Sequence, residues 1–463
     1  MNDITAFFAF LKYCLGYKEN MSRVIAGMNW HALYSFASKQ ALLGLCFEGI
    51  ERLGEEYPEE LKRNPIGREV LMIWMGKAQQ IRRQNMKVNA VASKLFSMLR
   101  EDGMRCCILK GQGNALMYPN PYSRTPGDID VWIDASRERI MEYAQKKFEL
   151  EDDIRLQHLE TSLDGVPVEL HFFPCSMNNP IYHARLQKWF RRNADLQCSH
   201  IVGLPDGAGD IAIPTTAFNV VYQLTHLYHH FFDEGIGMRQ IIDYFLVVND
   251  FSKNVFLNND LSNHPVNFSN HPVPLSKEGS TFSLSPSSMV FTPPSVPPFP
   301  GDRNLRSGDV TAPSRCSEPL RSKDGGPSKV SPDCAGWDRL GVNGDTTSTA
   351  LDVVQKELKH LGLWKFAGAV MYVLHETLGL SDEKMIAPMD EKRGKLLLAE
   401  ILNGGNFGRH FTKYGHFTQQ GMAKKYFLKI WRNMHFVRYY PAEALSEPIF
   451  RTWHFFWRLK HRR

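Results

Sequence analysis

The spacing of hydrophobic residues along this 463-residue chain changes from a helical to a strand period and back again. Over residues 1–100, apolar side chains recur three and four positions apart, which predicts a helical region that ends near Gly103. The run MRCCILKG that follows is short and continuously apolar, so it predicts a buried strand. Helical spacing returns from residue 177 to about 250 and again from Leu351, and we expect the helices on both sides of the interruption to pack together.

Residues 104–174 carry the signals of a small α/β unit in the order β-α-β-α-β-β. GQGNALMYPNP predicts a helix that begins near Gly111, GDIDVWID alternates as a strand does, and SRERIMEYAQKKFEL predicts a helix capped by Ser136. The Asp-Gly pair at 164–165 predicts a tight turn between two further strands. We therefore expect an α+β fold in which a mixed-sheet core is flanked by helical regions: core 101–175, helices 1–100, 176–255 and 350–463.

The composition of residues 256–349 differs from that of the rest of the chain. Between residues 261 and 340 lie 13 of the 26 prolines and 15 serines, with almost no apolar periodicity. Such a segment cannot bury enough apolar surface to offset the entropy lost on folding. We therefore predict a disordered insertion over 256–349.

The net charge of +6 is concentrated at one end of the chain. Residues 424–463 contain ten Lys/Arg and two acids, a charge of +8, so the other residues sum to −2. Eleven aromatic residues alternate with these basic residues. Contact with nucleic acid and an amphipathic helix on a membrane surface are two interpretations, but packing of the aromatics with Lys/Arg reaching outward is favoured.

General composition narrows the class of protein. Hydrophobic residues make up 43% and charged residues 22%, as in globular proteins. No apolar run approaches the ~18 residues that span a bilayer, and the first residues lack the features of a signal peptide. The eight cysteines form no CxxC pair. We expect a cytoplasmic protein with reduced thiols and no stable membrane insertion.

The sharpest chemical signal is the acidic pair in GDIDVWI. On a strand, Asp128 and Asp130 project from one face while Ile129 and Val131 face the core. Two carboxylates ~7 Å apart repel each other unless a cation lies between them, and Mg²⁺ prefers oxygen ligands while leaving positions open for phosphates. Glu169, in VPVELH, lies on a strand expected to pair beside the first. Three carboxylates on adjacent strands form the protein side of a two-metal site for phosphoryl transfer.

A glycine-containing turn precedes these acids. Lys110, Gly111, Gln112 and Gly113 join the predicted strand to the predicted helix, where backbone amides and a helix N-terminus can hold phosphates. Glycine allows close approach of a ligand, and Lys110 or Arg124 could neutralise phosphate charge. Acids alone on an alternating strand are usually a solvated face, but this combination within sixty residues favours a nucleotide site.

The run ILKGQGNALMYPNPYSRTPGDIDVWID closely resembles an uncharacterised bacterial nucleotidyltransferase family of the DNA polymerase beta superfamily. THLYHHFFDEGIGMRQIIDY resembles the helical part of the same family, so the resemblance covers most of the chain outside the insertion. It implies that Asp128 and Asp130 bind the metals and that Glu169 is the third carboxylate. It also implies that Gly111 and Gly113 lie in the nucleotide-binding turn, although the superfamily usually has Gly-Ser there.

Other polar residues permit two interpretations each. Arg239 and Asp243 are either a helix ion pair or, for Arg239, a contact to substrate phosphate. His171 either orients a ligand or lies on an edge strand. Three helical histidines include two at the spacing of metal ligands, but hydrogen bonding within a helical bundle is favoured: His226, His229 and His230.

These features predict a Mg²⁺-dependent nucleotidyltransferase, with two ions, that moves a nucleoside monophosphate from an NTP to an acceptor hydroxyl and releases pyrophosphate. The acceptor is a small molecule, a protein side chain or a nucleic-acid end. The alternative is an inactive nucleotide-binding or scaffold protein that retains the fold. Because Asp128 and Asp130 are both present, the enzyme is favoured.

Overall fold

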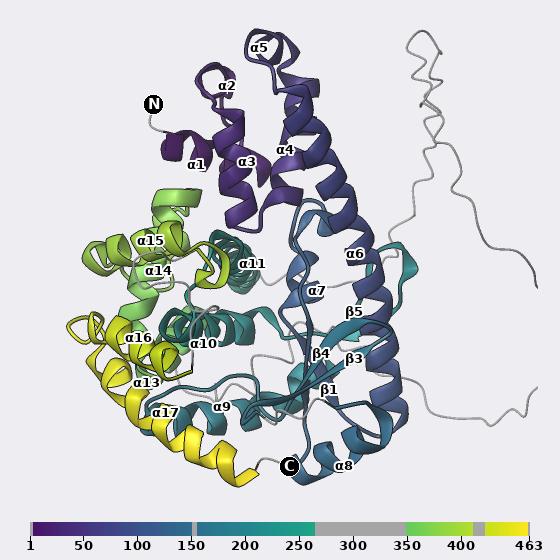
Figure 1. Ribbon diagram of the computed structural model, residues 1–463, viewed down its shortest axis with the longest axis vertical. Coiled ribbons are helices and arrows are strands. Elements are labelled where there is room, and N and C mark those ends of the chain that lie inside the picture. The colour runs from purple at the N-terminus through teal and green to yellow at the C-terminus, as the bar shows by residue number, and fades with distance from the viewer. Residues whose placement is uncertain (1–2, 151–154, 264–348, 411–421, 462–463) are drawn as a thin grey trace, which may run out of the picture. The chain divides into compact units, whose positions relative to one another are not determined.

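The computed structural model describes residues 3–150, 155–263, 349–410 and 422–461 (Figure 1). Within these ranges the fold is α+β, as predicted, with a four-stranded mixed sheet among many helices. Helix α11 (Met238–Asn263) continues through residues 256–263, which the sequence had placed in the insertion. Most of the predicted disordered insertion, residues 264–348, lies outside the described residues.

The N-terminal region is helical, as predicted. Its last and longest helix ends where the sequence indicated, because Gly103 adopts φ 72° and the backbone N–H of Met104 donates to the carbonyl of Leu99 (2.8 Å). The helices of this region are α1 (Asp3–Cys14), α2 (Ser22–Ala26), α3 (Trp30–Lys39), α4 (Leu43–Glu56), α5 (Pro58–Arg63) and α6 (Arg68–Glu101).

Helix α6 connects the helical region to the sheet (Figure 1). Near its start, the buried Trp74 donates its indole N–H to the carbonyl of Leu43 (2.8 Å). Towards its end, Val91, Leu95 and other apolar residues pack in one core with the strands. One side of the helix therefore fixes the sheet relative to the N-terminal helices.

The sheet has the strand order β1-β2-β4-β3, with β1 (Cys106–Leu109), β2 (Ile129–Ile133), β3 (His158–Leu163) and β4 (Val166–His171). Strands β2 and β4 are parallel, and the other two pairs are antiparallel. Asp164 and Gly165 both have positive φ (49° and 70°), which matches the twist of a two-residue hairpin. The predicted order of strands and helices is confirmed.

The intervening helices also begin where predicted. Helix α7 (Gly111–Ala115) starts at Gly111, and the Ser136 side chain accepts a hydrogen bond from the N–H of Arg139 at the start of α8 (Arg137–Lys147). The prediction missed a second sheet, β5 (Ile201–Gly203) and β6 (Asp210–Ala212), in a region expected to be helical. Strands of three residues are too short to show a period.

The helices before and after residues 264–348 share one hydrophobic core. Phe231, for example, lies 5.8 Å from Phe366 and 5.9 Å from Tyr440 between ring centroids. The helices of this part are α9 (Pro180–Ser199), α10 (Thr216–Asp233), α11, α13 (Ala350–His360), α14 (Trp364–Leu378), α15 (Glu391–Gly404), α16 (Met422–Met434) and α17 (Pro441–His461).

Ion pairs join the last two helices to α10. Asp233, at the end of α10, contacts Nζ of Lys429 in α16 (2.7 Å) and Nη2 of Arg451 in α17 (3.0 Å). Lys429 and Arg451 belong to the basic segment of residues 424–463, and they therefore compensate an acid of the helical core.

The aromatic side chains of residues 424–463 lie partly in the core and partly on the surface. Phe436 and Tyr440 are buried against α10, as the favoured interpretation predicted. On α17, by contrast, Trp453, Phe455 and Phe456 are exposed by 50%, 51% and 63%, so packing does not account for them.

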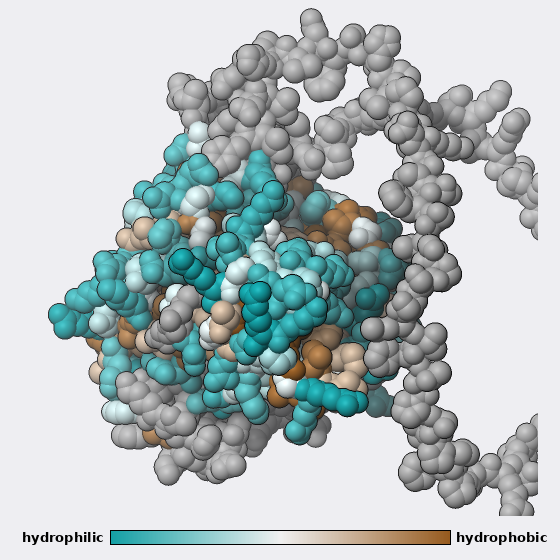
Figure 2. Space-filling view, turned by 90° about the horizontal axis from the view of Figure 1, so that it is seen from above, coloured by the Kyte–Doolittle hydropathy of each residue, from teal (hydrophilic) through white to brown (hydrophobic). Residues whose placement is uncertain are grey.

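The face seen in Figure 2, from the side of α2–α5, is mostly hydrophilic with small hydrophobic patches.

Two general expectations can be compared with the described part of the chain. None of its helices combines the length and apolarity needed to cross a bilayer. Its cysteines are free thiols, mostly buried: Cys14, Cys46, Cys106, Cys107, Cys175 and Cys198. Cys316 and Cys334 lie outside the described residues.

Candidate active site

The sheet brings the three predicted carboxylates to one place. Asp130 in β2 is directly opposite Glu169 in β4, and Asp128 lies one residue before β2. Ile129 and Val131 point into the core between the sheet and α6, as the alternation predicted. Asp130 is 6% exposed, whereas Asp128 is exposed.

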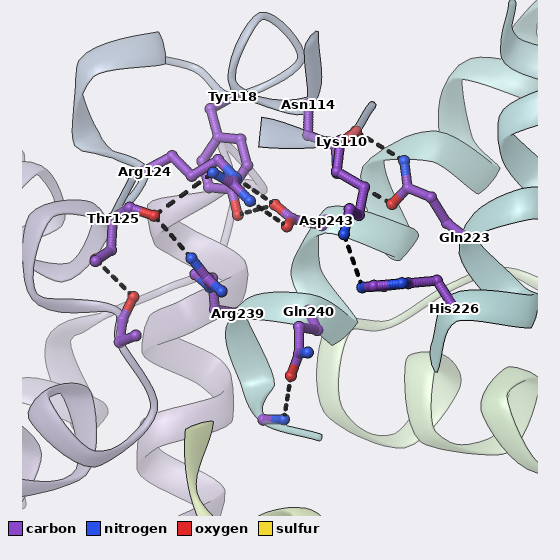
Figure 3. A network of polar contacts seen from close by, with 12 residues as sticks. Lys110, Asn114, Tyr118, Arg124, Thr125, Gln223, His226, Arg239, Gln240 and Asp243 are labelled. Carbon is purple, nitrogen blue, oxygen red and sulfur yellow. Dashed lines mark hydrogen bonds and ion pairs between the residues drawn. The ribbon is translucent and has the colours of Figure 1, made fainter. Parts of the chain in front are cut away.

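A pocket of about 500 Å³, including its open mouth, lies in front of the acidic pair. Its walls come from the turn after β1, the start of β2, helices α10 and α11, and a loop after α15. Reciprocal amide hydrogen bonds between Asn114 and Gln223 (3.0 and 2.7 Å) join α7 to α10 at one wall (Figure 3). The pocket is lined by Lys110, Gly111, Asn114, Arg124, Gly127, Asp128, Asp130, Gln223, His226, Leu227, Arg239, Gln240, Asp243 and Phe407.

Lys110 supplies positive charge to the pocket. Its Nζ lies 3.1 Å from Oδ2 of Asp130. The same Nζ lies 3.1 Å from Nε2 of His226 (Figure 3). Because an ammonium group only donates, Nε2 of His226 must accept, which leaves the proton on Nδ1. Burial and the charge of Lys110 hold the pKa of His226 well below its usual range, so His226 is neutral at physiological pH.

His171 joins two of the carboxylates. Its Nε2 lies 2.9 Å from Oδ1 of Asp130 and 3.1 Å from Oε2 of Glu169, and the residue is 2% exposed. The edge-strand interpretation of His171 is wrong, because β4 lies between β2 and β3. Burial disfavours the charged imidazole, but hydrogen bonds to Asp130 and Glu169 outweigh it and raise the pKa of His171 to about 9.

The carboxylates differ in how they titrate. Burial raises the pKa of Asp130, but Lys110 and His171 outweigh burial and hold it well below the usual range. The charge of Asp130 raises the pKa of Asp128 to about 6, with further contributions from partial desolvation of its carboxyl group and from the charge of Glu169. Repulsion between the two aspartates, which the sequence pattern predicted, is therefore a property of the folded site.

Arg124 is held by a carboxylate. Its Nε and Nη2 each donate to Asp243 at 2.8 Å, and the hydroxyl of Tyr118 donates to the same carboxylate at 2.8 Å (Figure 3). Arg124 and Asp243 are buried. The interpretation of Arg239 and Asp243 as a helix ion pair is therefore wrong, because the partner of Asp243 is Arg124, 119 residues away.

A comparison with models of known protein families assigns the chain to a family. Residues 26–262, just over half of the chain, match the family described as an uncharacterised nucleotidyltransferase. The protein belongs to that nucleotidyltransferase family. Searches of curated proteins and of solved structures found no match. Nucleotidyl transfer is thus the general reaction class, and every residue that lines the pocket except Phe407 lies in the matched range.

Two residues of the glycine-containing turn do not line the pocket of this nucleotidyltransferase. Gln112 is buried and donates to Oδ1 of Asn89 on α6. A Cβ atom at Gly113 would lie 3.0 Å from Cγ2 of Ile213, just after β6. The structure gives both residues packing contacts within the protein, whereas Lys110 and Gly111 face the pocket.

Arg239 is the second arginine of the pocket. Its Nη1 donates to the carbonyl of Thr125 (3.0 Å), and its Nε is buried without a hydrogen-bond partner in the described structure. A Cβ atom at Gly127 would lie 3.9 Å from Nη1, so Arg239 lies close to the backbone beside Asp128. This position supports the interpretation that Arg239 reaches substrate phosphate.

The sequence did not single out His158. Its Nδ1 lies 3.3 Å from Oε2 of Glu169, and one ligand atom from each of His158, Glu169 and His171 falls within 4.8 Å of the others. Burial and the charge of His171 lower the pKa of His158 to about 4. His158 is directly opposite His171 in the β3–β4 hairpin. Counting residues outward from the predicted turn at 164–165 would therefore have placed His158 beside His171.

The histidines of α10 occupy the wall behind Lys110. The rings of His226 and His230 are in edge-to-face contact, with centroids 4.3 Å apart. The His/Asp/Glu group with metal-ligand spacing among the described residues is the one at His158, not this one. The contacts of His226 to Lys110 and His230 agree with a packing role for these residues. The predicted hydrogen bonding within the helical bundle is not found at Nδ1 of His226, His229 or His230 in the described part of the chain.

Proposed function

We propose that this protein is a Mg²⁺-dependent nucleotidyltransferase that transfers a nucleoside monophosphate from an NTP to an acceptor hydroxyl. The observation that carries the proposal is the pair Asp128 and Asp130 at a pocket whose other charged residues include Lys110 and Arg239. Acids for a cation and cations for phosphates in one pocket are the requirements of phosphoryl transfer. The sheet order and acidic strand also lead us to assign the core to the DNA polymerase beta superfamily.

The residues present fit a hard divalent ion. Asp128 and Asp130 offer carboxylate oxygens, and the raised pKa of Asp128 reflects a repulsion that a cation would relieve. Asp128 and Asp130 would hold the ion, which when bound neutralises charge on the triphosphate. The prediction of a second ion depends on Glu169, which does not line the pocket but is joined to Asp130 through His171.

The protein's own groups position the substrate and stabilise charge. Lys110, adjacent to Asp130, and Arg239, beside Gly127, would neutralise phosphate oxygens of the NTP. The acceptor oxygen forms a bond to the α-phosphorus as the bond to the β-phosphate bridging oxygen breaks. Pyrophosphate leaves with the electron pair, and the hydroxyl proton passes to solvent. His171 keeps the carboxylates of Asp130 and Glu169 at fixed positions during this reaction.

The proposal is tested with each of the four α-³²P-labelled NTPs, Mg²⁺ and cell extract as the source of acceptor. Wild type should transfer label and release pyrophosphate, whereas Asp128→Asn and Asp130→Asn should lose at least about 100-fold in rate. Asp164→Asn, at an exposed acid paired with Lys94, is the matched control and should keep activity. NTP binding without label transfer by wild type would favour the inactive-binder alternative.

A further inference from the structure

Phe407 enters the pocket from outside the family-matched range. It lies in a short 3-10 segment (Asn406–Gly408) directly after α15 and is half-buried. The ring lines the same pocket as Asp128 and Asp130, although the residues differ by more than 270 positions in sequence. The part of the chain after residue 348 therefore contributes an aromatic side chain to a site otherwise built within residues 26–262.

The backbone around Phe407 is held in an unusual conformation. Phe407 has φ 53° and ψ 30°, a left-handed conformation that costs an aromatic residue stability unless its surroundings enforce it. Gly405, at φ 64° and ψ −167°, adopts a conformation essentially restricted to glycine. A Cβ atom at Gly237 would lie 2.7 Å from Cα of Asn406, so α11 begins in direct contact with this loop. Such strain at a pocket wall is typical of functional positions.

Two side chains fix the aromatic ring. The guanidinium carbon of Arg239 lies 5.5 Å from the ring centroid of Phe407, within cation–π range. The ring of His230 makes an edge-to-face contact at 5.3 Å. Phe407 is thus a preoriented apolar surface in a pocket otherwise dominated by polar and charged groups.

A hydrogen-bond donor without a partner lies in the same pocket. Gln240 is 7% exposed, and its Oε1 accepts a hydrogen bond from the backbone N–H of Gly237 at 2.7 Å (Figure 3). This contact fixes the amide orientation, which leaves Nε2 as a buried donor with no partner in the described structure. A buried donor of this kind is costly unless a ligand satisfies it.

We propose that Phe407 and Gln240 bind the nucleobase of the NTP. A base offers an aromatic face that can stack on the ring of Phe407 and acceptor atoms for the unpartnered amide N–H of Gln240. Arg239 positions the Phe407 ring, and the phosphates lie towards Lys110 and Asp128. This inference rests on the proposed function, because it assumes that the triphosphate binds at the acidic end of the pocket.

The test compares two probes that differ by the nucleoside. Isothermal titration calorimetry on the full chain with Mg²⁺ measures the Kd of each NTP and of inorganic triphosphate. Phe407→Leu removes the aromatic face, and it should weaken NTP binding about 5- to 100-fold while leaving triphosphate binding unchanged. Phe407→Trp should restore NTP affinity to within about threefold. Phe455→Leu, at an exposed phenylalanine of α17, is the control and should change neither Kd.

Gln240→Glu provides an independent arm. The glutamate keeps an oxygen to accept from Gly237 but replaces the free donor, so the ratio of NTP affinity to triphosphate affinity should fall at least about fivefold. Thermal unfolding of each variant confirms that it is folded.

The outcomes separate the two proposals. Wild-type protein that binds neither probe would overturn the proposed function and this inference with it. Wild-type NTP binding that Phe407→Leu leaves unchanged, or an equal loss for both probes, would overturn the nucleobase site alone.

Discussion

Replacing Asp243 with asparagine would isolate the contribution of the charge that holds Arg124 in the pocket wall. Arg124 is 4% exposed and Asp243 is 6% exposed, and two hydrogen bonds of 2.8 Å join them. Burial favours the neutral acid, but Arg124 outweighs it and lowers the pKa of Asp243. The asparagine variant leaves a buried guanidinium without a counter-charge, which should lower the free energy of unfolding by about 3–5 kcal/mol.

The assay is urea unfolding followed by tryptophan fluorescence, with a control and a rescue. Asp164→Asn breaks an exposed ion pair with Lys94 and should cost ~0–1 kcal/mol. The double variant Arg124→Met/Asp243→Leu removes both charges, so it should be more stable than Asp243→Leu alone. A loss of unfolding free energy from Asp243→Asn no greater than that from Asp164→Asn would show that Arg124 does not depend on this partner.

The double variant also separates two roles of Arg124. If Arg124 only stabilises the pocket wall through Asp243 and does not contact phosphate, a folded double variant should bind inorganic triphosphate with Mg²⁺ as tightly as wild type does. A loss of triphosphate affinity of about tenfold or more would instead support the predicted contact of Arg124 with phosphate.

Three further predictions concern stability and one concerns the metal. Burial raises the pKa of Glu443 to about 7 despite hydrogen bonds from backbone amides, so the folded state retains a proton that the unfolded state releases near pH 4.5. The stabilisation by this proton is complete below pH 4.5 and is lost as the pH rises to about 7, so the free energy of unfolding of wild type should fall by about 3 kcal/mol over that range. Urea unfolding of Glu443→Gln should show no such fall, because glutamine does not titrate. Gly113→Ala should lower the unfolding free energy by about 1 kcal/mol, and it should cost less in an Ile213→Ala background, which lacks the Cγ2 atom that the new Cβ approaches; unchanged stability with lost NTP binding would contradict the packing role. Asp233→Asn breaks the ion pairs to α16 and α17 and should speed hydrogen exchange in both helices, whereas equal exchange would show that their apolar contacts suffice. EDTA should abolish label transfer and Mg²⁺ should restore it with unchanged far-UV circular dichroism; transfer that persists in EDTA would contradict the metal requirement.

Local patterns determined much of the sheet and its acids. The alternation in GDIDVWI placed Asp130 on a strand with its neighbours in the core, and the Asp-Gly pair at 164–165 specified the hairpin. The cap at Ser136 and the helix end at Gly103 were also predictable. Each of these features depends on residues within a few positions of one another, where backbone preference and side-chain period act directly.

The folding of distant segments against one another determines which charged groups meet. Lys110 contacts His226, Arg124 pairs with Asp243, and Phe407 reaches the pocket from a segment beyond the family-matched range. Periodicity tells which side of an element is buried, but not which distant side chain it meets there. A buried charge must find a counter-charge. The packing of helices α10 and α11 beside α7, rather than the spacing of residues along the chain, selected these partners.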